Sequence, residues 1–128
     1  MVGLAAVVLA AGCGGGDERR TLTIPLEERS GSGQAGTAVL QDIGDSGTRI
    51  EIDVGSGVEE RQPARIYRGS CDELPAQAVY ALEDVIEGES VTELDVPLDD
   101  LTRSGFVLNV HLSEPVARVS VACGRLTP

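Results

Sequence analysis

The chain has 128 residues, the length of one domain, and carries a formal net charge of -11 from 21 acidic and 10 basic residues. All ten basic residues are arginines scattered along the chain, so no positive surface can form that would neutralise nucleic-acid phosphates. The aromatic residues are two tyrosines and one phenylalanine, which excludes base stacking and aromatic cages. With 16 glycines and a mainly aliphatic apolar set, the composition favours an all-β domain with many turns.

The N-terminal region has the pattern of an export signal. Residues 2–11 (VGLAAVVLAA) are apolar and uncharged, which is the length of a signal-peptide core and too short to span a bilayer of about 30 Å. The run ends in the small residue Ala11 and is followed by Gly12, Cys13 and three glycines. This order resembles a bacterial lipoprotein signal, in which the cysteine becomes the acylated first residue of the mature chain.

The lipoprotein resemblance implies a division of the chain and a location. Residues 1–12 would be the signal peptide, 13–20 a flexible tether and 21–128 a single β-sandwich domain, anchored by lipid on the extracytoplasmic face of the cell membrane. The chain departs from the family in having Ala10 three residues before Cys13, where leucine is usual, and in lacking a basic residue before Val2. The alternatives are a secreted protein cleaved nearby and an N-terminal helix that is retained.

The cysteine count supports export. The chain has three cysteines, and an odd number in an exported protein calls for a separate role for one of them. If Cys13 carries lipid, Cys71 and Cys123 remain as a possible pair in an oxidising compartment. Such a bridge would close a loop of about 53 residues and stabilise the fold by about 4 kcal/mol. The alternative is two unrelated buried thiols, and a metal centre is disfavoured because no CxxC motif or histidine cluster accompanies them.

From Thr21 onward, short β-rich segments recur about every 10 to 15 residues between clusters of Gly, Pro, Ser and Asp, as in a sandwich or barrel. The clearest alternation is in 49–54, where isoleucine and valine alternate with charged residues. Residues 45–47 (DSG) predict a hairpin turn, and 97–104 predict one short helix with Leu98 and Leu101 on one face. The predicted strands are 21–28, 37–43, 49–54, 63–67, 79–82, 90–96, 106–112 and 116–123.

Four phrases carry a second resemblance: 62–71 (QPARIYRGSC), 79–89 (VYALEDVIEGE), 109–111 (NVH) and 121–124 (VACG). Over most of residues 21–126 the chain resembles bacterial proteins of the copper/zinc superoxide dismutase-like superfamily, possibly of chordin type. The resemblance implies a Greek-key β-sandwich or barrel of about eight antiparallel strands with at most one short helix. It also implies a Cys71–Cys123 disulfide, and it places His111 where that family has a copper ligand.

The chain departs from this family at the metal site. Where the family has His-x-His, this chain has Arg65-Ile66-Tyr67, and strand alternation directs Arg65 and Tyr67 to the same face. Arginine stays protonated and repels a cation, His111 is the only histidine, and the zinc-binding segment has no counterpart. We therefore expect no enzymatic activity, no bound metal and no other cofactor.

Two groups of polar residues each allow two interpretations. Arg65, Tyr67 and His111 could form a small polar pocket for an anion, or His111 could simply be a strand-end histidine hydrogen-bonded to backbone. Acidic pairs such as Asp99-Asp100 could bind calcium, or they could be a solvated surface, since the DxDxDG loop is missing from the sequence.

These observations together predict a non-enzymatic, lipid-anchored, extracytoplasmic β-sandwich protein with a binding or cell-envelope role. The expected partners are the membrane, through the anchor, and a protein or small molecule that the sequence does not identify. Two alternatives stay open, namely a metal-binding or redox protein of the same superfamily and a module that acts through an exposed strand edge.

Overall fold

The structure is a computed structural model that describes residues 20–55, 60–113 and 119–128. The predicted signal peptide, the acylation site Cys13 and the tether through residue 19 lie outside these residues. In the described part of the chain, no helix is long and apolar enough to cross a membrane.

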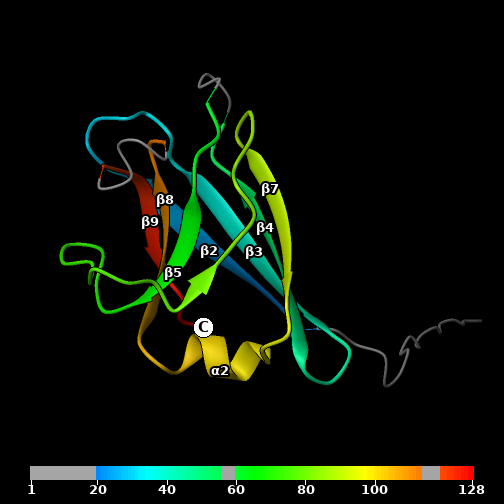
Figure 1. Cartoon of the computed structure of the whole chain (residues 1–128). Coiled ribbons are helices and arrows are strands. Elements are labelled where there is room, and N and C mark those ends of the chain that lie inside the picture. Colours follow the sequence, from blue (N-terminus) through cyan, green and yellow to red (C-terminus); the bar gives the residue numbers. More distant parts are fainter. Residues whose placement is uncertain (1–19, 56–59, 114–118) are drawn as a thin grey trace, which may run out of the picture.

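Eight antiparallel strands form one curled sheet, and a single short helix lies at one end of it in the described residues (Figure 1). The order across the sheet is β6-β5-β8-β9-β2-β3-β4-β7. This confirms the prediction of an all-β fold with about eight strands and one short helix. The elements in chain order are β2 (Thr21–Glu28), β3 (Gly36–Ile43), β4 (Gly47–Asp53), β5 (Ala64–Arg68), β6 (Tyr80–Ala81), β7 (Glu89–Leu94), α2 (Leu98–Thr102), β8 (Phe106–His111) and β9 (Ser120–Arg125).

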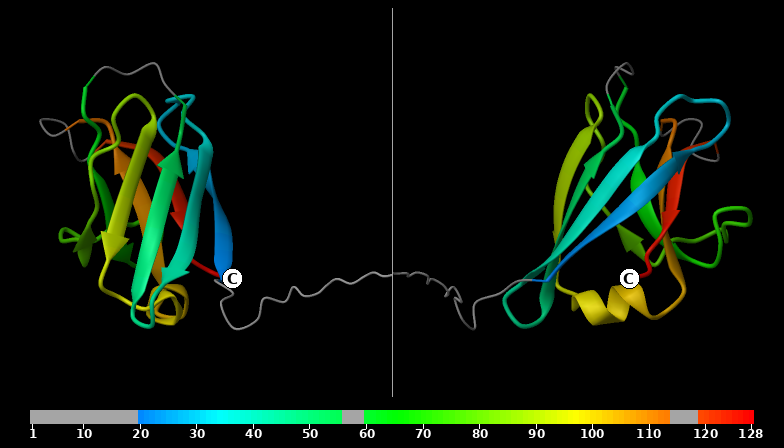
Figure 2. Two further views of the ribbon diagram at one scale, coloured as in Figure 1. Left: turned by 90° about the vertical axis from the view of Figure 1, so that its right-hand side faces the viewer. Right: turned by 180° about the vertical axis from the view of Figure 1, so that it is seen from behind.

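The sheet folds over into two layers, one of β2, β3, β4 and β7 and the other of β6, β5, β8 and β9 (Figure 2). Strand β2 joins them, because its first part pairs with β3 and its last two residues pair with β9. The N–H of Arg29 donates to Val121 O at 2.8 Å, and such pairs recur every second residue in an antiparallel ladder. Two further steps would place Pro25 opposite Arg125, but proline has no N–H to donate. Strands β2 and β9 therefore diverge from this point, and the carbonyl of Arg125 accepts a bond from Thr127 N instead.

An aliphatic core fills the space between the layers. In β4 the alternation puts Ile50 and Ile52 inside, as predicted, and leaves the polar residues between them outside. Burial of each such side chain contributes about 1.5–3 kcal/mol. Helix α2 closes one end of the core with Leu98 and Leu101, which are both buried. The largest fully buried apolar side chains of this core are Ile24, Leu26, Leu40, Ile50, Ile66, Leu101, Leu108, Leu126, Val54 and Val85.

The strand bounds differ from the predicted ones where pairing extends or shortens a strand. Strand β4 begins at Gly47, two residues early, because Thr48 pairs with Leu94 of β7. Strand β6 keeps only two residues, since only these pair with β5. Strand β9 runs on to Arg125 because Gly124 and Arg125 pair with β8, and residues 116–118 of the predicted strand lie outside the described residues.

Candidate functional site

A second set of apolar residues lies on the outside of the layer that contains β5, β8 and β9. Alternation points Ile66 into the main core and the next residue, Tyr67, to the outer face. We call this set the outer cluster. It consists of Tyr67, Val107 and Cys123, with Cys71, Leu74 and Ala78 packed against them from the segment that follows β5.

The disulfide is the covalent part of the outer cluster. Cys71 and Cys123 are bonded, with their Cα atoms 5.9 Å apart, which lies within the usual range for a disulfide. The pairing that cysteine parity allowed and the resemblance implied is therefore confirmed. Arg29 reinforces it, because its guanidinium donates to Cys71 O at 3.1 Å and to Asp72 Oδ1 at 2.8 Å. Sequence reasoning did not single out Arg29, whose partners are more than forty residues away in the chain.

Two of the three predicted pocket residues meet beside the disulfide. Tyr67 Oη lies 2.8 Å from His111 Nε2, and their rings make an edge contact with centroids 5.7 Å apart. Both residues are almost fully buried, at 4% and 3% exposed. The backbone N–H of His111 donates to Pro63 O at 2.8 Å. The third residue, Arg65, lies two positions before Tyr67 on β5 and is half-buried.

Asn109 is a buried polar residue that sequence reasoning did not select. It lies opposite Arg65 in the β5–β8 register, and its Nδ2 is 3.2 Å from His111 Nε2. It is 0% exposed, and its Oδ1 has no hydrogen-bond partner within the described residues. The signal in the sequence was a single amide within an apolar strand, two residues from His111 and so on the same face.

The outer cluster is a poor metal site by its donor chemistry. In residues 20–55, 60–113 and 119–128, no three His, Cys, Asp or Glu side chains lie close enough together to hold a metal ion. The Nε2 atom of His111 is in contact with the tyrosine hydroxyl, and both nearby sulfurs form the disulfide. The polar side chains nearby are Tyr67 and Asn109, which contact His111, and Arg65, which lies opposite Asn109. These are hydrogen-bonding groups and not typical ligands of copper or zinc.

A cleft of about 640 Å³ lies on the other side of the disulfide, where β2 and β9 diverge. Its lining includes both cysteines together with Glu27, Arg29 and Arg125. None of the three predicted pocket residues lines it. The cleft thus presents both charge signs, and nothing in its lining favours one class of ligand.

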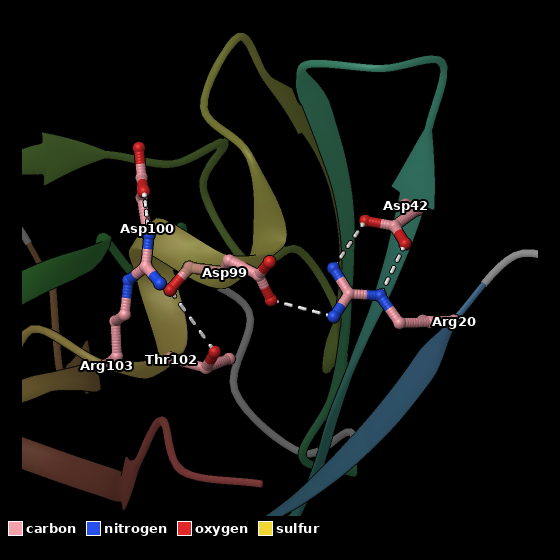
Figure 3. Close-up of polar contacts among 6 residues, drawn as sticks. All are labelled: Arg20, Asp42, Asp99, Asp100, Thr102 and Arg103. Atoms are coloured by element: carbon pink, nitrogen blue, oxygen red, sulfur yellow. Dashed lines mark hydrogen bonds and ion pairs between the residues drawn. The ribbon is translucent and has the colours of Figure 1, made fainter.

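The acidic residues of α2 form ion pairs at the end of the sandwich (Figure 3). Arg20 donates to Asp99 Oδ1 at 2.7 Å and to Asp42 Oδ2 at 2.9 Å, and Arg103 lies 3.5 Å from Asp100 Oδ1. The hydrogen bond from Arg20 holds the pKa of Asp99 below its ordinary value, and the Arg20 guanidinium has its pKa raised by Asp42 and Asp99. These carboxylates have arginine partners, which supports the solvated-surface interpretation over calcium binding.

Comparison with known proteins adds no relative. No protein-family model matches the chain, and neither the curated proteins nor the solved structures contain a significant match.

Proposed function

We propose that this chain is a non-enzymatic binding module of the bacterial cell envelope, anchored to the membrane by lipid on Cys13 and built on a superoxide dismutase-like sandwich that has lost its metal site. One observation carries the proposal. A buried contact between Tyr67 and His111 lies beside the Cys71–Cys123 disulfide, at the place where the resemblance implies metal ligands.

The loss of catalysis is supported by burial and by chemistry. A general acid or base must come within hydrogen-bond reach of a substrate, and the two ring-bearing side chains here are almost fully enclosed. Arg65, in the position of the first ligand of the His-x-His motif, would repel a cation. What is left of this face is a rigid polar contact that holds β5 against β8.

The disulfide supports a location outside the cytoplasm, because such bonds form and persist in oxidising compartments. The apolar run at 2–11 and the cysteine that follows it supply the route there. The high negative charge of the chain keeps such a domain soluble at the membrane surface.

The anchor is tested by expressing the full chain in a bacterium fed a labelled fatty acid. We expect the wild type to carry label and to stay in the membrane fraction at high salt, because the two acyl chains of a diacylglyceryl group hold durably. Cys13→Ala should lose the label and become soluble, whereas Cys13→Ala protein that stays with membranes at high salt would contradict the proposal. Cys71→Ser serves as the matched control, because it removes a cysteine but should leave the label in place.

The absence of redox function is tested by metal analysis of the purified protein, grown with copper and zinc and compared with His111→Ala and Tyr67→Phe. We expect substoichiometric metal in all three proteins and no dismutation of superoxide. Stoichiometric copper or zinc that disappears in His111→Ala would favour the alternative, a metalloprotein of the superfamily.

A further inference from the structure

The N-terminus of the described domain, helix α2 and the turn between β3 and β4 lie at one end of the sandwich (Figures 1 and 2). The register places them there, because Thr21 at the start of β2 is opposite Gln41 near the end of β3, and β7 runs toward the same end before α2 begins. We call this the α2 end. The far end carries the segments 29–35 and 82–88, which follow β2 and precede β7.

Arg20 fixes the point where the chain leaves the domain. Its guanidinium bonds Asp42 of β3 and Asp99 of α2 (Figure 3), and its carbonyl accepts a bond from Asp42 N at 3.1 Å. Two separate elements thus hold the same residue. Anything N-terminal to Arg20 therefore starts from the α2 end.

The distance to the proposed anchor is short. Six residues lie between Cys13 and Arg20, and the seven Cα-to-Cα steps that join the two span at most about 25 Å even when fully extended. Strand β2, which runs from one end of the sandwich toward the other, has eight residues and is about 26 Å long. A tether of this length cannot pass along the whole domain and still reach the membrane.

The charge of the α2 end decides how it meets a lipid surface. Exposed or half-buried aspartates outnumber arginines there, and an anionic bilayer repels such a surface within a Debye length of about 10 Å. Around Arg20 the acidic residues are Asp42, Asp45, Asp95, Asp99 and Asp100, and the other arginine is Arg103. Arg68, which donates to Ser104 O, and Arg125 lie on the β5–β9 side of the same end.

We propose, on the basis of the lipid anchor at Cys13, that the α2 end faces the membrane, that its aspartates keep it away from anionic headgroups, and that the far end points away from the membrane. The contacts of Arg20 with Asp42 and Asp99 and the six residues between Cys13 and Arg20 set the orientation. The aspartates set the distance between the α2 end and the anionic headgroups.

The orientation is tested by energy transfer with the full lipidated chain in phosphatidylcholine vesicles that carry an acceptor dye on their headgroups. A donor dye is placed on Ser46→Cys, in the exposed β3–β4 turn, or on Ile86→Cys, an exposed position at the far end. Because the two positions differ by about one strand length, roughly 26 Å, we expect at least about twofold greater transfer from Ser46. In vesicles with phosphatidylglycerol, transfer from Ser46 should fall at low salt and recover at high salt.

The controls separate the two proposals. A twenty-residue Gly/Ser insertion after Gly16 should abolish the difference between the labels, because the tether then no longer orients the domain. If neither label shows transfer and the purified chain carries no lipid, the anchor itself is wrong. If the chain is lipidated and vesicle-bound but Ile86 transfers as well as Ser46, the anchor stands and the orientation is wrong.

Discussion

The main core and the outer cluster lie on opposite faces of the same three strands, and they are stabilised in different ways. The main core is almost wholly aliphatic and draws on both layers and the helix. The outer cluster has three buried members, of which Cys123 forms the disulfide with Cys71 and Tyr67 contacts the neighbouring polar residue His111. Ile66 and Tyr67, adjacent in β5, belong to one each.

The two regions differ in how much each depends on any single contact. The main core is held by many apolar contacts of similar kind, so neighbouring side chains can adjust when one methyl group is removed. In the outer cluster each contact is made by a particular pair of atoms, so its parts are expected to depend on one another. The predictions below test this difference.

The largest effect is expected from the disulfide. Cys71→Ser and Cys123→Ser should each lower the free energy of unfolding by about 2 to 5 kcal/mol, since the bridge joins residues 52 apart and restricts the unfolded chain. The double variant should add little, because each single change already removes the bond. Denaturant titration of the soluble domain measures this. Equal stability of oxidised wild type and either serine variant would contradict it.

The next effect tests how tightly the main core is closed. Gly124 of β9 lies directly against β2, and an added Cβ would collide with the carbonyl oxygen of Pro25 and approach Leu26 Cδ2. Because a backbone atom cannot move aside, Gly124→Ala should cost about 1–3 kcal/mol.

The control for this change is Gly47→Ala. Its Cβ would meet Ile43 Cγ1 at 3.0 Å and the carbonyl oxygens of Ile43 and Leu94 at 3.1 and 3.2 Å. These contacts need a shift of only a few tenths of an ångström, so a smaller cost is expected than at Gly124. Equal midpoints for the two variants in thermal unfolding would show that β2 can move away from Gly124 at little cost.

A matched pair of changes compares the two regions directly. Ile66→Val removes one methyl group from the main core, at a cost of about 0.5–1.5 kcal/mol. Tyr67→Phe removes one hydroxyl from the outer cluster and with it the 2.8 Å contact to His111, also at about 0.5–1.5 kcal/mol.

The two variants should differ in their coupling to the disulfide. In a double-mutant cycle with Cys71→Ser, Tyr67→Phe should show a coupling of about 0.5 kcal/mol or more, whereas Ile66→Val should be additive within about 0.3–0.5 kcal/mol. Denaturant titration of the four proteins in each cycle gives both values. A coupling that is the same for both residues would contradict the stronger interdependence expected for the outer cluster.

The sequence predicts the main core well because strand alternation is a local signal. Ile50, Ile52, Leu98 and Leu101 are buried as their spacing indicates. The pairing of Cys71 with Cys123 could also be predicted, because these two cysteines remain when Cys13 is assigned to the lipid.

The sequence predicts the outer cluster less completely because its contacts are distant in the chain. The register pairs Tyr67 with Val107 and brings His111 beside Pro63, so the contact of Tyr67 with His111 spans four positions along the strands. It needs coordinates, as do the roles of Asn109 and Arg29. A polar residue in an apolar strand is a signal, but its partners are set by register. Strand ends were displaced for the same reason, as at Gly47.

The smallest effect is expected from the exposed ion pairs at the α2 end, which belong to neither region. The pKa of Asp99 is lowered from its ordinary value of 3.8 by the hydrogen bond from Arg20. A carboxyl group with a lowered pKa stabilises the fold above its unfolded-state pKa, and the contribution is lost as pH falls through the folded-state value. The stability difference between wild type and Asp99→Asn should therefore be constant near neutral pH, shrink below about pH 3.8 and decrease in high salt. Asp100→Asn is the control, since its contact with Arg103 is longer, at 3.5 Å. Denaturant midpoints measured across pH test this, and an Asp99→Asn loss as large as that of Cys71→Ser would mean that the contacts of Arg20, and not the two apolar regions, determine the stability of the domain.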